Sequence, residues 1–107
     1  MGKGDPDIPI PPLPPGNDCG QLTFETVLNS VNEAVLGELR IGTVLRVSRQ
    51  IEQARPLAFC YLGQQQVGTV TGPQVGDLLE CLKAGYRYEG TISALDGGLV
   101  RVVIRPA

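Results

Sequence analysis

The stretch that decides the fold runs from Gly90 to Arg105 and reads GTISALDGGLVRVVIR. Apolar and polar residues alternate on both sides of its glycine pair, which is typical of two strands that each bury one face. The residues that share the buried face are Gly90, Ile92 and Ala94 in the first strand and Val100, Val102 and Ile104 in the second. The stretch therefore predicts an antiparallel β-hairpin near the end of the chain.

The length of the turn follows from the need to keep both faces buried. A two-residue turn at Asp96-Gly97 would pair Ile92 with Arg101 and set a charge against the apolar face. A three-residue turn, from Asp96 to Gly98, pairs Ile92 with Val102 and places a glycine at the left-handed third position. We therefore predict the three-residue turn, which also pairs Ala94 with Val100 and, on the outer face, Glu89 with Arg105.

The same kind of pattern predicts the other elements. Apolar alternation or apolar runs indicate strands at about 22–28, 42–49, 57–62 and 66–70, with a polar loop from Gln50 to Pro56. A leucine stripe at helical spacing predicts a helix over about 74–84, formed by Val75, Leu78, Leu79 and Leu82. The capping-box spacing of Ser30 and Glu33 predicts a short helix over about 31–36. Because a flat sheet of this size would expose its edges, we predict a mainly β (β-rich α+β) fold, a small, partly open barrel of about five or six strands.

Residues 1–18 differ in composition from the rest. They hold six of the nine prolines, and proline lacks an amide donor, so neither a helix nor a central strand is expected there. We divide the chain into an extended or disordered proline-rich tail, 1–18, and a single domain, 19–107. The tail has a net charge of −2, whereas the eight basic and eight acidic residues of the domain cancel. A domain without net charge has no long-range field to attract nucleic acid or acidic lipid.

The cysteines indicate neither a metal site nor a disulfide framework. Cys19, Cys60 and Cys81 are widely spaced, no CxxC pair occurs and the chain has no histidine, so we expect no zinc site and no cofactor. Cys60 in an apolar strand and Cys81 in the helix predict buried, reduced thiols. The chain also lacks an apolar run of ~20 residues and an apolar signal core. We therefore expect a cytoplasmic protein that does not bind membranes.

The sequence offers little for catalysis. Without histidine, a serine or cysteine nucleophile would need another base, and no known motif supplies one. Asp77 and Glu80 lie three residues apart on the predicted helix, where they form either a carboxylate pair or ordinary exposed charges. We favour the second interpretation and expect no catalytic residues.

Three consecutive segments resemble the HIRAN family: Gly63–Val70, the leucine-striped Gln74–Gly85 and the returning strand Tyr86–Ile92. Gly42–Arg49 is similar to the strand that precedes this unit, so the resemblance covers about residues 39–105. It implies a small barrel that grips single-stranded DNA ends and is usually attached to helicases or nucleases. An asparagine-proline-aspartate-type segment of the family is replaced here by Gln50–Pro56, and the chain has only five aromatic residues with which to stack on bases.

Two sets of residues are candidates for binding. The first is the tail segment that offers aliphatic side chains and PxxP spacing on a proline-rich rod, either as a ligand for a protein groove or as a spacer: Ile8, Pro9, Ile10, Pro11, Pro12, Leu13, Pro14 and Pro15. The second is a set of outward arginines that could contact a partner or phosphates: Arg46, Arg87, Arg101 and Arg105.

The sequence therefore predicts a non-catalytic binding or adaptor module, an accessory component of a larger intracellular assembly that acts through protein–protein contacts. A single-stranded DNA or DNA-end binding module of HIRAN type is the alternative. Val27 and Val103, both expected on outer faces, also leave open a homo-oligomer.

Overall fold

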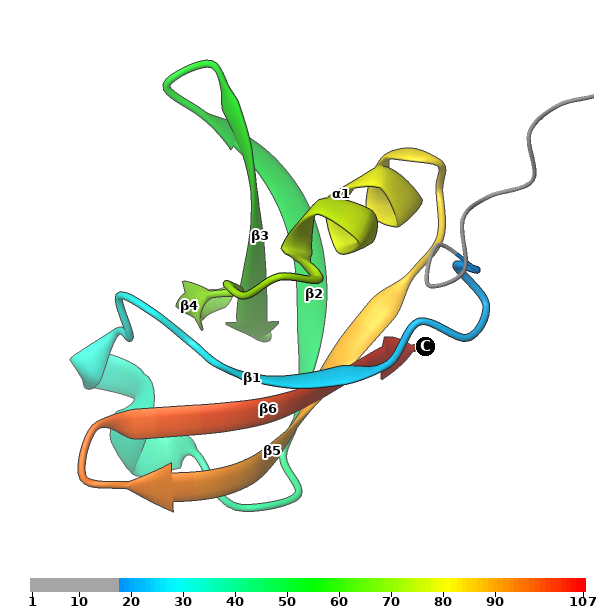
Figure 1. The fold of residues 1–107 in the computed structure, drawn as a ribbon. Helices are drawn as coiled ribbons and strands as arrows, with labels where there is room; N and C mark the ends of the chain where they lie inside the picture. Colours follow the sequence, from blue (N-terminus) through cyan, green and yellow to red (C-terminus); the bar gives the residue numbers. More distant parts are fainter. Residues whose placement is uncertain (1–17) are drawn as a thin grey trace, which may run out of the picture.

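The computed structural model describes residues 18–107, so the tail segment with its candidate residues Ile8 to Pro15 lies outside the described residues. The described part is mainly β, with six antiparallel strands, one α-helix and one 3-10 helix (Figure 1). The strands are β1 (Phe24–Val27), β2 (Val44–Glu52), β3 (Arg55–Leu62), β4 (Gln65–Thr69), β5 (Tyr88–Asp96) and β6 (Leu99–Pro106), and the helices are η1 (Glu33–Glu38) and α1 (Val75–Lys83). The predicted fold class is confirmed.

The six strands form one sheet in the order β1-β6-β5-β2-β3-β4. The sheet curls until its two edge strands come together beyond the end of β1. There Asn29 and Thr69 exchange both backbone hydrogen bonds, at 2.9 and 2.8 Å, in an isolated bridge. An open sheet whose edges meet at a single bridge agrees with the predicted partly open barrel.

The predicted inward faces form the core except at Ala94, whose place against the core is taken by Leu95. Val100, Val102 and Ile104 of β6 are fully buried, as is Leu45 of β2. Helix α1 lies over one end of the curled sheet and packs against β2 and β3 (Figure 1). Its most deeply buried residues are Leu78 and Cys81, whereas Val75, Leu79 and Leu82 pack half-buried against the core. The predicted leucine stripe is therefore in contact with the core, and Leu78 is its most deeply buried residue.

The predicted three-residue turn of the last hairpin is wrong. Asp96 pairs with Leu99, so the turn consists of Gly97 and Gly98, with Gly97 at φ 64°. This register would misalign the apolar faces, but a β-bulge at Ser93 shifts the pairing by one residue. As a result Leu95 pairs with Val100 and Ala94 with Arg101, while the predicted pairs Ile92–Val102 and Glu89–Arg105 are present. The bulge restores the alternation that the short turn alone would have broken.

The predicted loop from Gln50 to Pro56 is also wrong. Strands β2 and β3 continue through most of it and are joined by a two-residue turn at Gln53 and Ala54, whose φ values are 52° and 64°. Two left-handed residues suit a tight hairpin turn, although such turns usually carry asparagine or glycine. Pro56 is tolerated because this part of β3 is an edge: the pairing of β3 with β4 begins only at Phe59, so no strand there needs an amide donor from Pro56. This end of the hairpin projects from the sheet (Figure 1).

The prediction of a reduced thiol at Cys81 is wrong as well, because Cys81 forms a disulfide with Cys19 across 62 residues of sequence. The hydroxyl of Tyr88 donates a hydrogen bond to the carbonyl of Cys19 and holds the same segment. Cys60 is free and buried as predicted, and desolvation raises the pKa of its thiol to about 12. The disulfide could not be predicted because the pairing depends on where α1 lies, and residue spacing does not reveal that.

Candidate functional site

A row of polar side chains crosses the outer face of the sheet. Arg105 of β6 pairs with Glu89 of β5, Glu89 pairs with Arg46 of β2, and Arg46 pairs with Tyr61 of β3. Residues that pair directly across antiparallel strands point to the same face of the sheet. Four strands therefore place two arginines, a carboxylate and a phenol side by side.

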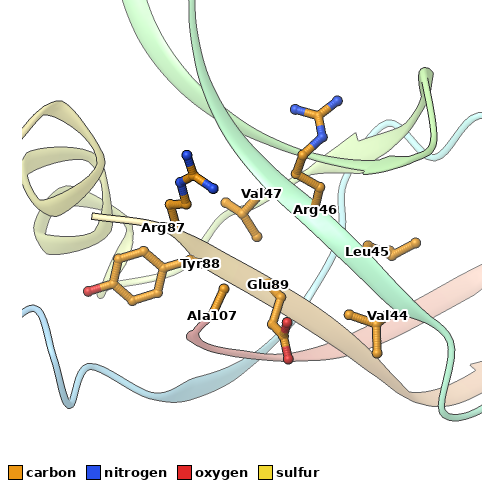
Figure 2. A pocket seen from close by; sticks show the side chains of 8 residues that line it. All are labelled: Val44, Leu45, Arg46, Val47, Arg87, Tyr88, Glu89 and Ala107. Atoms are coloured by element: carbon orange, nitrogen blue, oxygen red, sulfur yellow. The ribbon is translucent and has the colours of Figure 1, made fainter. Parts of the chain in front are cut away.

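This row borders an open groove of about 650 Å³ on the β2–β5 side of the sheet (Figure 2). Its lining residues are Val44, Leu45, Arg46, Val47, Arg87, Tyr88, Glu89 and Ala107. Leu45, Val47 and Tyr88 belong to the core. The outward side chains at the groove are therefore Val44, Arg46, Arg87 and Glu89, and Val44 is 53% exposed. The groove combines an apolar contact with charges of both signs.

The two arginines of the groove are oriented alike. Figure 2 shows the guanidinium groups of Arg46 and Arg87 extending in the same direction, while the side chain of Glu89 points the other way. Arg87 directly precedes β5 and stands two residues before Glu89, the partner of Arg46, so the two arginines are diagonal neighbours. Such neighbours lie about 7–8 Å apart. That value is the spacing of their backbones, and both guanidinium groups lie on the same face of the sheet. Each can donate several hydrogen bonds in a fixed fork to an anionic ligand.

Arg46 is held in place by its neighbours on β3. Its guanidinium carbon lies 4.8 Å from the centre of the Tyr61 ring, and the same group donates a hydrogen bond of 3.3 Å to the carbonyl of Gly63. The Tyr61 ring in turn meets Phe59 edge to face at 6.5 Å. Phe59 is only 3% exposed although it lies outside the main core cluster. This chain of contacts limits the rotation of Arg46 before any ligand arrives.

The four predicted arginines do not form one cluster. Arg46 and Arg87 line the groove, and Arg105 stands beside it as the partner of Glu89. Arg101 lies four residues from Arg105 along β6, a distance of about 13 Å. It pairs with Val27 on one side and with Ala94 on the other, far along the strand from the groove.

Sequence reasoning missed two contributors to the site. Val44 precedes the inward Leu45, so alternation could have placed it outward, but it was not singled out. Tyr61 could also have been placed outward, since it follows the buried Cys60 by one residue. Of the two tyrosines that flank Arg87, Tyr88 is buried, whereas Tyr86 is 51% exposed.

The chemistry of the groove is suited to binding. Arg46 and Arg87 supply only hydrogen-bond donors, and Glu89 has the one side-chain carboxylate among the lining residues. Asp77 and Glu80, the pair considered for acid–base chemistry, do not line the groove. Within residues 18–107 no group of three or more histidine, cysteine, aspartate or glutamate side chains could hold a metal ion.

In the same part of the chain, neither helix is long and apolar enough to cross a bilayer.

Comparison of the chain with protein-family models, with curated proteins and with solved structures finds no match in any of the three. The resemblance to the HIRAN family therefore stays a prediction. The case for a function depends on the groove.

Proposed function

We propose that this chain is a non-catalytic binding module that holds a protein partner in the groove that lies over β2 and the start of β5. The observation that carries the proposal is the parallel orientation of Arg46 and Arg87 beside the exposed Val44 (Figure 2). Two guanidinium groups can hold a carboxylate-bearing segment, and the valine offers it an apolar contact. Binding surfaces commonly combine a few well-placed polar groups with apolar area in this way.

A protein partner suits the charges of the groove better than a nucleic acid does. Glu89 lies in the groove beside Arg46 and Arg87, so the net charge of its lining side chains is only +1. Binding to a phosphate backbone draws its affinity from many cationic contacts, and a carboxylate among them repels the backbone. In addition, one aromatic ring near the groove, Tyr61, is already covered by Arg46. A base would have to displace that guanidinium in order to stack there.

The proposal is tested by co-purification of the full chain from its native host, with Arg87→Glu as the groove variant. Arg101→Glu is the matched control, because it makes the same change on the same sheet face outside the groove. We expect one or more proteins to be recovered with the wild type and with Arg101→Glu and to be lost with Arg87→Glu. Equal recovery with all three proteins would refute the groove as the contact surface. Tight, salt-sensitive binding of a labelled single-stranded oligothymidylate, lost with Arg87→Glu, would favour the DNA-binding alternative.

The disulfide changes the expected compartment. The cytoplasmic expectation depended partly on reduced thiols, and Cys19 and Cys81 are joined. Since structural disulfides persist in oxidising environments, we propose that the chain functions in one. Thiol alkylation during extraction from native cells tests this: one reactive thiol per unfolded chain is expected, whereas three would place the chain in a reducing compartment.

A further inference from the structure

The chain enters the folded part close to the groove. The carbonyl of Cys19 accepts the hydrogen bond from the Tyr88 hydroxyl, and the Cys19–Cys81 disulfide holds the same residue against α1. Tyr88 lies between Arg87 and Glu89 in the chain, and its side chain points to the core side of the sheet. The point at which residues 1–17 join the described part is therefore one tyrosine side chain away from the first residue of β5, which follows Arg87.

The sequence of that segment complements the groove. Asp5 and Asp7 supply two carboxylates, and Ile8 and Ile10 follow with aliphatic side chains. Pro6 keeps the chain between the carboxylates out of a helix, and an extended chain separates residues two apart by about 6–7 Å. The backbones of the diagonal neighbours Arg46 and Arg87 are about 7–8 Å apart, so the two pairs match in backbone spacing.

We propose that the groove is occupied by the N-terminal segment of the same chain, with Asp5 and Asp7 against Arg46 and Arg87 and the isoleucines against Val44. This inference rests on the proposed function, because it names the segment that an outside partner must displace. Ten residues lie between Asp7 and Asp18, so the eleven residue steps span up to about 34 Å at ~3.1 Å per residue. The segment is therefore long enough to reach the groove from its anchored end.

The tether gives the segment an advantage over any free ligand. A short linker holds a ligand at an effective concentration of about 1 mM. If the same residues bind as a free peptide with a Kd of about 0.1 mM, the attached segment fills the groove about ten times as often as it leaves it empty. The attached segment then weakens the binding of a competing peptide about tenfold.

The test is a titration of a labelled synthetic peptide, residues 4–16, into two forms of the full chain. One form is the wild type, and the other carries Asp5→Lys and Asp7→Lys, which removes the charge complementarity without altering the described fold. We expect the peptide to bind the double variant about tenfold more tightly than the wild type. Adding Arg87→Glu to the double variant should abolish binding, whereas adding Arg101→Glu should not change it.

Each other outcome contradicts the inference. Equal affinity for both forms would show that the attached segment does not fill the groove, and binding that survives Arg87→Glu would place the peptide elsewhere. No binding to either form would exclude the complementarity itself. A wild-type dimer that the tail substitutions convert to a monomer would show exchange between two chains instead. The proposed function is tested separately from the peptide titration: it fails if Arg87→Glu retains the co-purified partner, whatever the peptide does.

Discussion

Breaking the Cys19–Cys81 disulfide should destabilise the domain far more than its position near the start of the folded part suggests. The bond joins residues 62 apart, and the chain between them contains β1 to β4 and most of α1. In the chain-entropy model, cross-linking a loop of this length destabilises the unfolded state by about 4 kcal/mol. A small domain has a total stability of about 5–15 kcal/mol. The bond therefore contributes a large fraction of that total.

The assay is urea unfolding of the wild type and of a Cys19→Ser/Cys81→Ser variant, each with and without a dithiol reductant. With a denaturant slope of about 1.5 kcal/mol/M, a loss of about 4 kcal/mol lowers the midpoint by about 2–3 M. We expect the reductant to lower the wild-type midpoint to that of the double variant and to leave the variant unchanged. The variant thus controls for effects of the reductant on the buried Cys60.

Two results would refute this reasoning. A wild-type midpoint that does not respond to the reductant, although mass spectrometry shows the bond to be reduced, would mean that the bond does not limit the unfolded chain. Alternatively, the midpoint could hold while hydrogen exchange increases only near residues 18–22. The Tyr88–Cys19 hydrogen bond and the disulfide would then fasten a local segment, with no global effect.

Four further predictions concern two buried side chains and two glycines. Leu78→Ala should lower the free energy of unfolding by about 2–5 kcal/mol, since the side chain is fully buried, as measured by urea unfolding. Gly68→Ala should destabilise by about 1–3 kcal/mol, because the added methyl carbon would lie 3.0 Å from the side chain of Leu28 beside the bridge that joins the sheet edges; an unchanged midpoint would contradict this. Gly76→Ala should instead stabilise by about 0.4–1 kcal/mol, since it lies in α1 with nothing within 4 Å of the new carbon. Because the pKa of Cys60 is raised, the unfolded state loses its thiol proton first, so the contribution of this group to stability should decline as pH rises from 9.0 to about 12. Native Cys60 should also resist alkylation below its folded pKa. A difference in stability from Cys60→Ala that does not change with pH would contradict this.

The sequence predicted correctly those strands and helices whose position follows from burying one face of the element. Alternation placed Val102 and Ile104 inward and Arg46 outward, and all three lie as expected. The helix was predicted from its leucine stripe with an error of one residue at each end. In these elements burial of one face dominates, and the sequence displays its period directly.

The errors arose where two local effects compensate for one another. A short turn at Gly97 and a bulge at Ser93 together give the same buried pairs around Ile92 as a longer turn without a bulge. The alternation of apolar residues cannot separate these solutions, because both bury Ile92 against Val102. At Gln53 and Ala54 the left-handed turn lacks the residues that usually mark one, so the sequence indicated a loop.

The groove required information that no single strand contains. Sequence reasoning placed Arg46 and Arg87 on outer faces, but it could not show that β5 lies between β6 and β2 in the sheet. That order joins residues 43 apart, Arg46 and Glu89, into one pair and makes Arg87 a diagonal neighbour. Had β5 paired with β4 instead, the same arginines would be separated by other strands and no two-arginine site would exist. The order of the strands, fixed by how the whole core packs, is therefore what turns scattered charges into a binding surface.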